Sequence, residues 1–350
     1  MKRSGPIKLG IIGLGRAGKG MHAAELEGKE SKFIIAAVCD VVPERMQLFR
    51  DQYGARPHSN MAELLSDPDV EVVCIATRSM DHFDHASVAL RAGKHVFLEK
   101  PMTTRYSDAV RLRAIARKSK GKLLVRHNRY WEPCFQHVNE IIASNVLGDV
   151  FEIRLRRNNY LRRDDWQTIK KFGGGQLLNW GPHIIQHALH FINYQVKDMW
   201  SHLRRVAAAG DAEDFVKILL LGRNGRLIDL EISGGTAIGG PVYFIAGTKG
   251  ALVSQDEQTI SLRYLDPGKP LPAREAQAGT PAAMAFGSPE DLPWIERTIP
   301  VAPAVKGDMT SCWDALYDAI RLGKPFPVSL DNAVDVMRIV SRARRGTPFE

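Results

Sequence analysis

One segment near the start of the chain restricts the possible folds more than any other. Residues 8–12 have the apolar content of a buried strand, and they lead directly into the loop Gly13-Leu14-Gly15-Arg16-Ala17-Gly18. Such a G-x-G-x-x-G loop between a strand and a helix can bind a dinucleotide pyrophosphate, because glycine allows a tight turn and the helix N-terminus offers amide donors. The candidate cofactor-binding residues are Gly13, Gly15, Arg16, Ala17 and Gly18. The alternative is a glycine-rich turn without a ligand.

An acid at the end of the next strand supports the dinucleotide interpretation. Asp40 follows a strand expected at residues 33–39 and comes about 20 residues after the loop. An acid there accepts hydrogen bonds from the adenosine ribose hydroxyls and repels a ribose 2′-phosphate, so NAD is favoured over NADP. Arg45 keeps NADP possible. Asp40 also has the position of a helix N-cap for the segment that starts near Pro43, and the two roles are compatible.

The first 125 residues alternate between short apolar runs and segments with helical periodicity. Strands are expected at residues 8–12, 33–39, 70–75, 95–98 and 122–125. Helices are expected at residues 18–28, 43–53, 61–65, 81–93 and 104–119. Strands that alternate with helices form a parallel, doubly wound sheet, so residues 1–125 are predicted to be a Rossmann domain of the α/β class.

After residue 125 the pattern changes to short strands separated by glycine turns. The expected strands are 150–157, 215–221, 227–233, 241–247, 251–255 and 260–264, and the expected helices are 133–144, 308–322 and 331–343. Residues 266–303 are rich in proline, alanine and glycine and are expected to be irregular. Residues 126–350 are therefore predicted to be an α+β domain with an antiparallel sheet, and its last helix, about residues 331–345, is expected to pack back on the first domain.

Composition restricts the class of protein and its partners. Of the 350 residues, 44% are hydrophobic and 25% are charged, which is typical of a soluble globular chain. The net charge of +9 comes from scattered basic residues and short local groups, so an anionic small ligand explains it and no nucleic-acid partner is expected. The first apolar stretch, residues 7–14, is too short to span a membrane, so no membrane partner is expected either.

Cysteine and histidine spacing indicates neither a disulfide framework nor a metal site. The four cysteines are far apart and form no C-x-x-C pair, namely Cys39, Cys74, Cys134 and Cys312. They are expected to be reduced thiols in a cytoplasmic protein. Four histidines of the first domain lack the spacing of zinc ligands, namely His22, His82, His85 and His95. No metal is predicted.

Two further motifs carry a resemblance to a known family. Glu99-Lys100-Pro101 follows the fourth expected strand, and Gly173-Gly174-Gly175 lies further along the chain. With the glycine loop, these motifs are similar to those of the glucose-fructose oxidoreductase and inositol dehydrogenase family, GFO/IDH/MocA. Residues 75–77 with His82 look like the family's third-strand loop, and Asn128-Arg129 resembles the opening of its second domain. The resemblance implies a Rossmann domain followed by an α+β domain built on a large, mostly antiparallel sheet.

The same resemblance implies roles for individual residues. Lys100 is implied to lie beside the nicotinamide and to hydrogen-bond the reacting hydroxyl, and His183 matches the histidine that accepts the hydroxyl proton. Thr77, His82 and Glu99 belong by resemblance to the cofactor side of the site. Without the resemblance, Lys100 would be interpreted as a surface lysine before a proline.

Asn179 departs from the family pattern, in which an acid precedes the catalytic histidine by four residues on one helix face. An amide can orient the substrate or His183, but it cannot take up a proton or stabilise a cationic imidazole as a carboxylate does. The usual lysine, aspartate and histidine set is therefore incomplete, with Asn179 as its third catalytic candidate. Asp164 or Asp165 is a candidate replacement acid.

The segment 159–166 is expected to border the substrate cleft. Tyr160 and Trp166 can stack on a sugar ring, and Arg162 or Arg163 can bind a carboxylate or phosphate. The expected substrate contacts are Arg129, Tyr160, Arg163, Asp165, Trp166 and His187. A solvated loop is an equally good interpretation of this segment.

Together these features predict an NAD(P)-dependent oxidoreductase that transfers hydride between nicotinamide and a secondary hydroxyl or ketone of a sugar, polyol or glycoside. Two alternatives stay open. One is a redox-cycling glycosidase, epimerase or lyase that regenerates its NAD in place, and the other is a non-enzymatic regulator that senses a dinucleotide or a sugar. By the family resemblance, an open sheet face in the second domain is expected to be covered by another subunit, which implies a homodimer or homotetramer.

Overall fold

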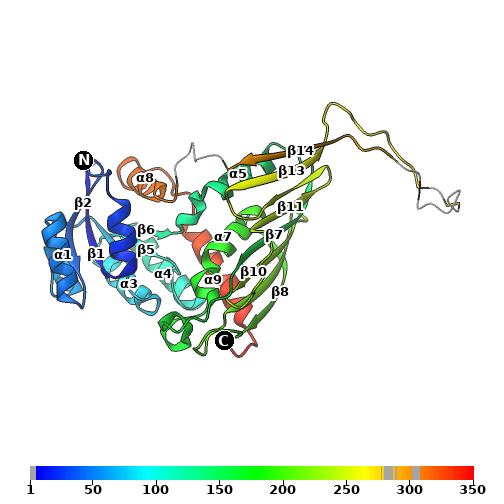
Figure 1. Ribbon diagram of the computed structural model, residues 1–350. Helices are drawn as coiled ribbons and strands as arrows, with labels where there is room; N and C mark the ends of the chain where they lie inside the picture. Colours follow the sequence, from blue (N-terminus) through cyan, green and yellow to red (C-terminus); the bar gives the residue numbers. More distant parts are fainter. Residues whose placement is uncertain (1–4, 277, 280–286, 288–289, 302–307) are drawn as a thin grey trace.

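The computed structural model describes residues 5–276, 278–279, 287, 290–301 and 308–350. The chain forms two sheets, and helices α5, α7 and α9 lie between them (Figure 1). The first sheet belongs to the N-terminal third of the chain and the second to the remainder. This two-sheet arrangement confirms the predicted fold class.

Six parallel strands form the first sheet in the order β3-β2-β1-β4-β5-β6. Their bounds are β1 Ile7–Ile12, β2 Phe33–Cys39, β3 Arg56–Pro57, β4 Val72–Ile75, β5 His95–Glu99 and β6 Leu123–Arg126. The five predicted strands are all present; β3 was missed because it has only two residues, both exposed. The strand order reverses between β1 and β4, and in such sheets ligands bind at the carboxyl ends of the strands beside this point.

Helices cover both faces of the first sheet, as the alternating pattern predicts. They are the π-helix η1 Gly18–Ala23, α1 Pro43–Tyr53, α2 Met61–Ser66, the 3₁₀-helix η2 Ser79–Asp81, α3 His82–Arg91 and α4 Tyr106–Lys118. The helix predicted for residues 18–28 was too long. The segment ends in a turn at Gly28, whose φ of +79° is not helical.

Eight strands form the second sheet in the order β14-β13-β12-β11-β7-β10-β9-β8. Their bounds are β7 Val150–Asn158, β8 Val196–Arg204, β9 Phe215–Gly222, β10 Leu227–Ser233, β11 Tyr243–Gly247, β12 Gly250–Ser254, β13 Thr259–Leu265 and β14 Trp294–Pro300. All neighbours are antiparallel except β7 and β10. The large, mostly antiparallel sheet is thus confirmed.

Two strands of this sheet were not predicted. β8 was overlooked, and β14 lies inside residues 266–303, so the prediction that this whole stretch is irregular was wrong. Both are the edge strands of the sheet and are mostly exposed. An exposed edge strand lacks the alternation of buried apolar residues on which strand prediction depends.

The remaining helices connect or follow these strands; α7 and α9 lie along the inner face of the second sheet, and α8 lies against the first domain (Figure 1). They are η3 Asn128–Trp131, α5 Pro133–Ala143, η4 Trp166–Thr168, η5 Lys170–Phe172, α6 Gln176–Asn179, α7 Gly181–Phe191, α8 Ser311–Tyr317, η7 Asp318–Leu322 and α9 Leu330–Arg344. No helix in the described part of the chain has both the length and the apolar run needed to cross a membrane.

The C-terminal helices join the two halves of the molecule. Trp313 of α8 packs edge-on against Phe33 and Phe97 of the first sheet, with ring centroids 5.6 and 5.1 Å apart. Helix α9 packs against both α4 and α7. An ion pair of 2.9 Å joins Arg117 of α4 to Asp331 of α9. The last part of the chain therefore holds the second sheet in place against the first domain.

Candidate active site

The glycine loop has the geometry of a phosphate cradle. Gly13 has a φ of +88°, and a Cβ atom there would lie 2.7 Å from the Ala76 carbonyl oxygen. A Cβ atom on Gly18 would lie 2.0 Å from the Gly13 carbonyl oxygen. Gly15 differs, because its Cβ would meet only the Arg45 guanidinium, at 3.8 Å. The outer two glycines are thus required by packing, and the middle one faces open space of the kind that a pyrophosphate needs.

Asp40 connects the glycine loop to the end of β2. Its carboxylate accepts hydrogen bonds from the backbone amides of Leu14 at 2.6 Å and Val42 at 2.8 Å. The N-cap of α1 is Val42, so Asp40 does not cap that helix directly. The Arg45 guanidinium lies 3.5 Å from Asp40, so both the ribose-binding acid and a cation for a 2′-phosphate lie beside the loop.

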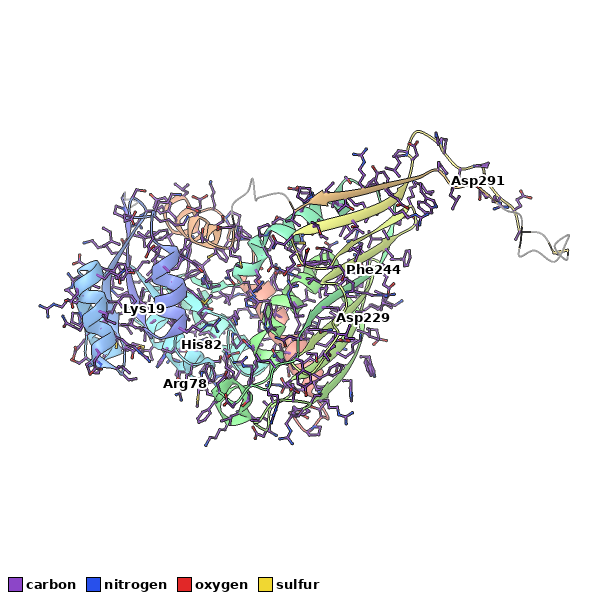
Figure 2. The ribbon with its side chains drawn as sticks, in the orientation of Figure 1. Lys19, Arg78, His82, Asp229, Phe244 and Asp291 are labelled. Carbon is purple, nitrogen blue, oxygen red and sulfur yellow. The ribbon has the colours of Figure 1, made fainter. Side chains whose placement is uncertain are left out.

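Two side chains predicted on the cofactor side mainly contact the protein itself. His82 is buried, and its ring nitrogens lie 2.7 Å from the Pro101 carbonyl and 3.3 Å from the Thr77 carbonyl. The hydroxyl of Thr77 lies 3.0 Å from Nδ1 of His85. Figure 2 shows His82 within the first domain. Its ring joins the loop after β4 to the turn after β5, where the Lys100–Pro101 bond is cis, so its role is to hold the backbone around Lys100.

Glu99 lies in a buried network of charges beneath the site. Its carboxylate contacts Nε2 of His22 at 2.9 Å and accepts a hydrogen bond of 2.7 Å from Arg126, which is also paired with Glu25. Burial by itself raises the pKa of Glu99, but Arg126 and His22 together hold that pKa well below its ordinary value. Trp313 donates a 2.8 Å hydrogen bond to Glu25. The side chain of Glu99 therefore supports the strand that carries Lys100, and its direct contact with a cofactor stays a prediction.

Lys100 is held at the carboxyl edge of the first sheet by the second domain. Its Nζ donates a hydrogen bond of 3.1 Å to the backbone carbonyl of Asn179. Burial lowers the pKa of Lys100 to about 8; Glu99 acts in the opposite direction, and Arg129 and Arg126 lower the pKa further. A lysine in this state can both release and accept a proton near neutral pH.

His183 lies in the first turn of α7 and is nearly buried. Burial lowers its pKa well below the ordinary value, and the positive charges of Lys100 and Arg129 lower it further. The imidazole is therefore neutral at neutral pH, and its Nδ1 is a buried polar atom that the described chain leaves without a partner.

The structure brings Lys100, Asn179 and His183 together, but Asn179 and His183 do not lie on the single helix that the family pattern implied. Helix α6 ends at Asn179 and α7 begins at Gly181, so Trp180 separates the two helices. It is the main-chain carbonyl of Asn179 that contacts Lys100. Any residue at position 179 would supply this backbone carbonyl. The negative charge of the family's aspartate side chain, by contrast, is not replaced by the neutral amide of Asn179.

His127 is a further residue of the site that the sequence did not reveal. It follows β6 directly, is 1% exposed, and is neutral because burial and the nearby Lys100 lower its pKa to about 4. The available signal was its position immediately after a parallel strand, at the same sheet edge as Lys100. No motif marked it.

Arg129, a predicted substrate contact, lies against the aromatic face of Trp180. Its guanidinium carbon is 4.3 Å from the ring centroid, and it is paired with Glu132. Arg157 donates a 3.1 Å hydrogen bond to the same carboxylate. Burial raises the pKa of Glu132 to about 7, against the opposing effect of the two arginines. Trp180, Glu132 and Arg157 were not predicted, because their approach depends on the folding of three separate segments.

The remaining predicted substrate residues are not gathered at one point. His187 is fully buried, with Nε2 2.9 Å from the Arg129 carbonyl and its ring stacked on Phe135. It therefore positions Arg129 and is not open to a ligand. Arg163 pairs with Asp165 at 2.6 Å, so neither is an uncommitted charge. Trp166 is half-buried and Tyr160 is exposed.

Comparison with known proteins identifies the family. Residues 7–127 match the NAD-binding Rossmann fold of the GFO/IDH/MocA oxidoreductases, and residues 135–253 match the GFO/IDH/MocA C-terminal domain. The chain belongs to this family. It is an NAD(P)-binding oxidoreductase, and the cradle at Gly15 fits the dinucleotide that the family binds.

Three relatives show how far the similarity extends. The scyllo-inositol 2-dehydrogenase (NADP(+)) IolW of Bacillus subtilis is 26% identical over 96% of this chain and 92% of its own length. The inositol 2-dehydrogenase of Salmonella paratyphi B is 32% identical over 46% of this chain and 49% of its own. The solved structure of Bacillus subtilis yvaA superposes with a TM-score of 0.83 at 22% identity, covering 99% of this chain and 97% of that one. This last similarity shows the shared fold.

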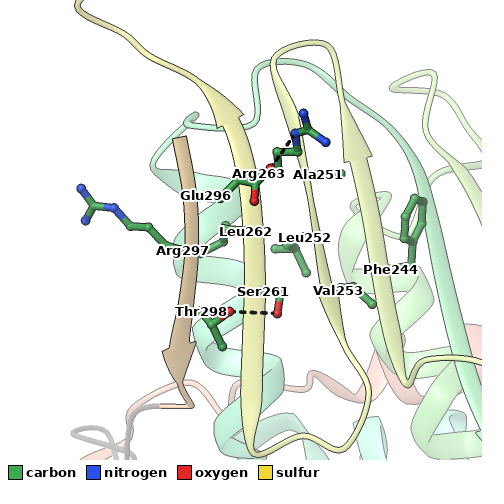
Figure 3. Close-up of a pocket in the computed structure, with 10 residues that line it drawn as sticks. All are labelled: Phe244, Ala251, Leu252, Val253, Ser261, Leu262, Arg263, Glu296, Arg297 and Thr298. Carbon is green, nitrogen blue, oxygen red and sulfur yellow. Dashed lines mark hydrogen bonds and ion pairs between the residues drawn. The ribbon is translucent and has the colours of Figure 1, made fainter. Parts of the chain in front are cut away.

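A large surface pocket, here called the hollow, lies in the second sheet of this GFO/IDH/MocA protein, far from Lys100. It has a volume of about 450 Å³ and lies on the outer face of strands β11 to β14 (Figure 3). An ion pair of 3.2 Å between Arg263 and Glu296 crosses it. Phe244 and Asp229 also lie on this outer face (Figure 2). Since the sheet separates the hollow from α7, it is not part of the catalytic site.

Among the described residues, no three histidine, cysteine or acidic side chains are grouped so that they could hold a metal ion. The four cysteines are buried free thiols.

Proposed function

We propose that the protein is an NAD(P)-dependent dehydrogenase or reductase that acts on a secondary hydroxyl or ketone of a polyol or sugar. The observation that carries the proposal is the placement of Lys100, 3.1 Å from the Asn179 carbonyl and beside the neutral His183. The relatives named for scyllo-inositol and inositol support a polyol as the substrate.

Lys100 is the group proposed to move the proton. Because its pKa is about 8, part of the population is neutral near neutral pH and can accept the hydroxyl proton, while the protonated part can donate a proton to a carbonyl in the reverse direction. His183, which stays neutral, hydrogen-bonds the same oxygen and orients it. Bound nicotinamide supplies the hydride chemistry.

A screen of sugars, polyols and sugar acids with NAD and with NADP tests this proposal. We expect the absorbance of reduced nicotinamide to accumulate with at least one polyol. Conversion of a sugar without net reduction of the cofactor would instead support the redox-cycling alternative. Dinucleotide binding without turnover of any compound would contradict both and favour a regulator.

Asn179→Asp is expected to shift the pH dependence of turnover. A carboxylate at this position stabilises the charged forms of Lys100 and His183, so it raises both pKa values. In the oxidation direction, the rise of kcat/KM with pH should therefore move to higher pH by about one unit. The pH profile of the variant is compared with that of Asn179→Ser, which adds no charge and should leave the profile in place. Identical profiles for all three proteins would contradict the role given to this position.

We further propose that a second copy of the chain covers the outer face of the eight-stranded sheet. Trp200 on β8 is 54% exposed and Trp294 on β14 is 38% exposed, and the hollow of Figure 3 lies on the same face. Burial of such aromatic side chains stabilises subunit association. Sedimentation equilibrium should show a dimer or tetramer, and a monomer at micromolar concentration would contradict this proposal.

A further inference from the structure

One buried histidine of the first domain takes no part in the mechanism proposed above. His22 lies in η1, four residues after the last glycine of the dinucleotide loop, and its side chain is fully buried. Its Nε2 atom lies 2.9 Å from Oε1 of Glu99, and its Nδ1 atom has no hydrogen-bond partner among the described residues. Within that part of the chain, the carboxylate of Glu99 is thus the single hydrogen-bond partner of this ring.

Aromatic side chains fix the orientation of the His22 ring. It packs edge-on against Trp313 of α8 with ring centroids 5.3 Å apart, and the ring of Phe97 on β5 lies 6.2 Å away. The turn that carries His22 is a π-helix, a rare geometry that is frequent at functional sites. The imidazole is therefore held in one direction, with Nε2 toward Glu99.

The two oxygens of the Glu99 carboxylate have different partners. Oε1 contacts His22 and accepts a 2.7 Å hydrogen bond from Arg126. Oε2 accepts a 3.2 Å hydrogen bond from the backbone amide of Lys100. The last torsion of a glutamate side chain is soft, and Arg126 is shared with Glu25, so Arg126 alone does not fix the plane of this carboxylate. His22 supplies the second donor that keeps Oε2 directed at Lys100.

The charge of Glu99 determines which group donates in the contact with His22. Against the effect of burial, Arg126 and His22 hold the pKa of Glu99 well below its ordinary value, so this side chain is ionised. An ionised carboxylate only accepts hydrogen bonds. Nε2 of His22 therefore carries a hydrogen and donates it to Glu99.

The same carboxylate acts on the amine of Lys100. Burial lowers the pKa of Lys100, and Glu99 raises it. Nearby cations lower this pKa further, namely Arg129, Arg126 and Arg16. Two histidines also lie within electrostatic range of the amine and are neutral, namely His127 and His183. Glu99 is thus the negative charge that opposes these effects, and its position matters for the reactivity of the lysine.

We propose that His22 is a positioning residue, which connects the turn after the dinucleotide loop to Lys100 by holding the Glu99 carboxylate against the lysine backbone. The inference rests on the proposed function and adds a residue that acts on the reacting lysine through another side chain. Because the His22 ring is fully buried, it does not itself exchange a proton with the substrate.

Two substitutions separate the hydrogen bond of His22 from its packing. His22→Gln keeps an N–H donor but loses the ring, whereas His22→Phe keeps a ring against Trp313 but has no donor. For the best substrate, His22→Phe should lower kcat by roughly 10- to 100-fold with little change in KM, as expected when a reacting group is slightly displaced. His22→Gln should recover most of the lost rate, because the donor is restored.

A second donor-free variant makes this comparison independent of one substitution. His22→Met should behave as His22→Phe does, and dinucleotide titration verifies that each variant is folded. A loss of kcat in His22→Gln as large as in the two donor-free variants would overturn the proposal, because the histidine would then serve packing alone. Full kcat in all three variants would overturn it as well.

The state of Lys100 can also be measured without turnover. Competitive labelling with acetic anhydride and mass spectrometry of the Lys100 peptide report the pH at which this amine loses its proton, with the exposed Lys19 as internal reference. In His22→Phe this midpoint should fall from about 8 by roughly half a unit, because Glu99 no longer faces Lys100 in a fixed position. His22→Gln should keep the wild-type midpoint.

The labelling separates failure of the inference from failure of the proposed function. An unchanged midpoint in His22→Phe would refute the positioning role, whatever the enzyme converts. A wild type that converts no sugar or polyol would instead refute the proposed function, while a lower midpoint in His22→Phe alone would still support the connection from His22 through Glu99 to Lys100.

Discussion

Lys100→Met is expected to reduce kcat/KM for the best substrate by about 100- to 10,000-fold, the range typical of a lost general acid or base. The methionine fills similar space but cannot exchange a proton or donate to the developing alkoxide. Binding of the dinucleotide should persist, because the glycine loop is unchanged. The measurement is steady-state kinetics together with dinucleotide titration of the same preparation.

The pH dependence of the wild type provides an independent check on Lys100. If the neutral amine accepts the hydroxyl proton, oxidation should speed up as the pH rises through about 8, and reduction should slow over the same range. Lys100→Met should lose this change of rate with pH near 8. Lys19→Met, which alters an exposed lysine on η1, is the matched control and should keep both rate and profile. Retention of full activity by Lys100→Met would refute the mechanism.

Arg126→Met is expected to lower the free energy of unfolding by about 3–5 kcal/mol, the cost of leaving a buried charge without its partner. Arg126 is fully buried, and its guanidinium contacts both Glu99 and Glu25. Its removal leaves Glu99, which is 6% exposed, without its strongest opposite charge. Urea unfolding followed by tryptophan fluorescence measures the loss, because Trp313 donates a hydrogen bond to Glu25 in the same network.

The loss should also depend on pH in a defined direction. The pKa of Glu99 is held below its value in the unfolded chain, about 4.3, so its contribution to stability is present above that pH and is lost as the pH falls. The difference in the free energy of unfolding between the wild type and Arg126→Met should therefore become smaller at acidic pH. Arg117→Met removes a mostly exposed partner of Asp331 and should cost far less. Equal effects of the two substitutions would contradict the importance of the buried network.

Much of the fold followed from local patterns. All five predicted strands of the first sheet are present because each is a short apolar run that parallel neighbours and helices bury on both faces. The edge strands β8 and β14 escaped prediction, since mostly exposed strands have neither a continuous apolar run nor a regular alternation of apolar and polar residues. Gly28 likewise ended a helix that periodicity alone extended too far.

Some residues of the candidate site were likewise predictable from local motifs, and others were not. Gly13, Gly18 and Lys100 belong to contiguous motifs, so their neighbourhood was predictable from adjacent residues and from the family resemblance. His127 and Glu132 belong to no motif, because each acquires its environment from segments that are distant in the chain. His187 was predicted as a substrate contact, but it is buried, stacked on Phe135 and in contact with the Arg129 carbonyl, so it supports Arg129.

The sequence alone determined the dinucleotide fold, because a glycine loop between a strand and a helix has local geometric requirements that few other residues satisfy. Only the tertiary structure decided the state of the reacting groups. The pKa of Lys100 depends on burial between two domains and on cations from other strands, and its hydrogen bond uses the carbonyl of Asn179, which no side-chain pattern can reveal. Electrostatic environment is a property of three-dimensional neighbours, so it appears only when the two domains are assembled.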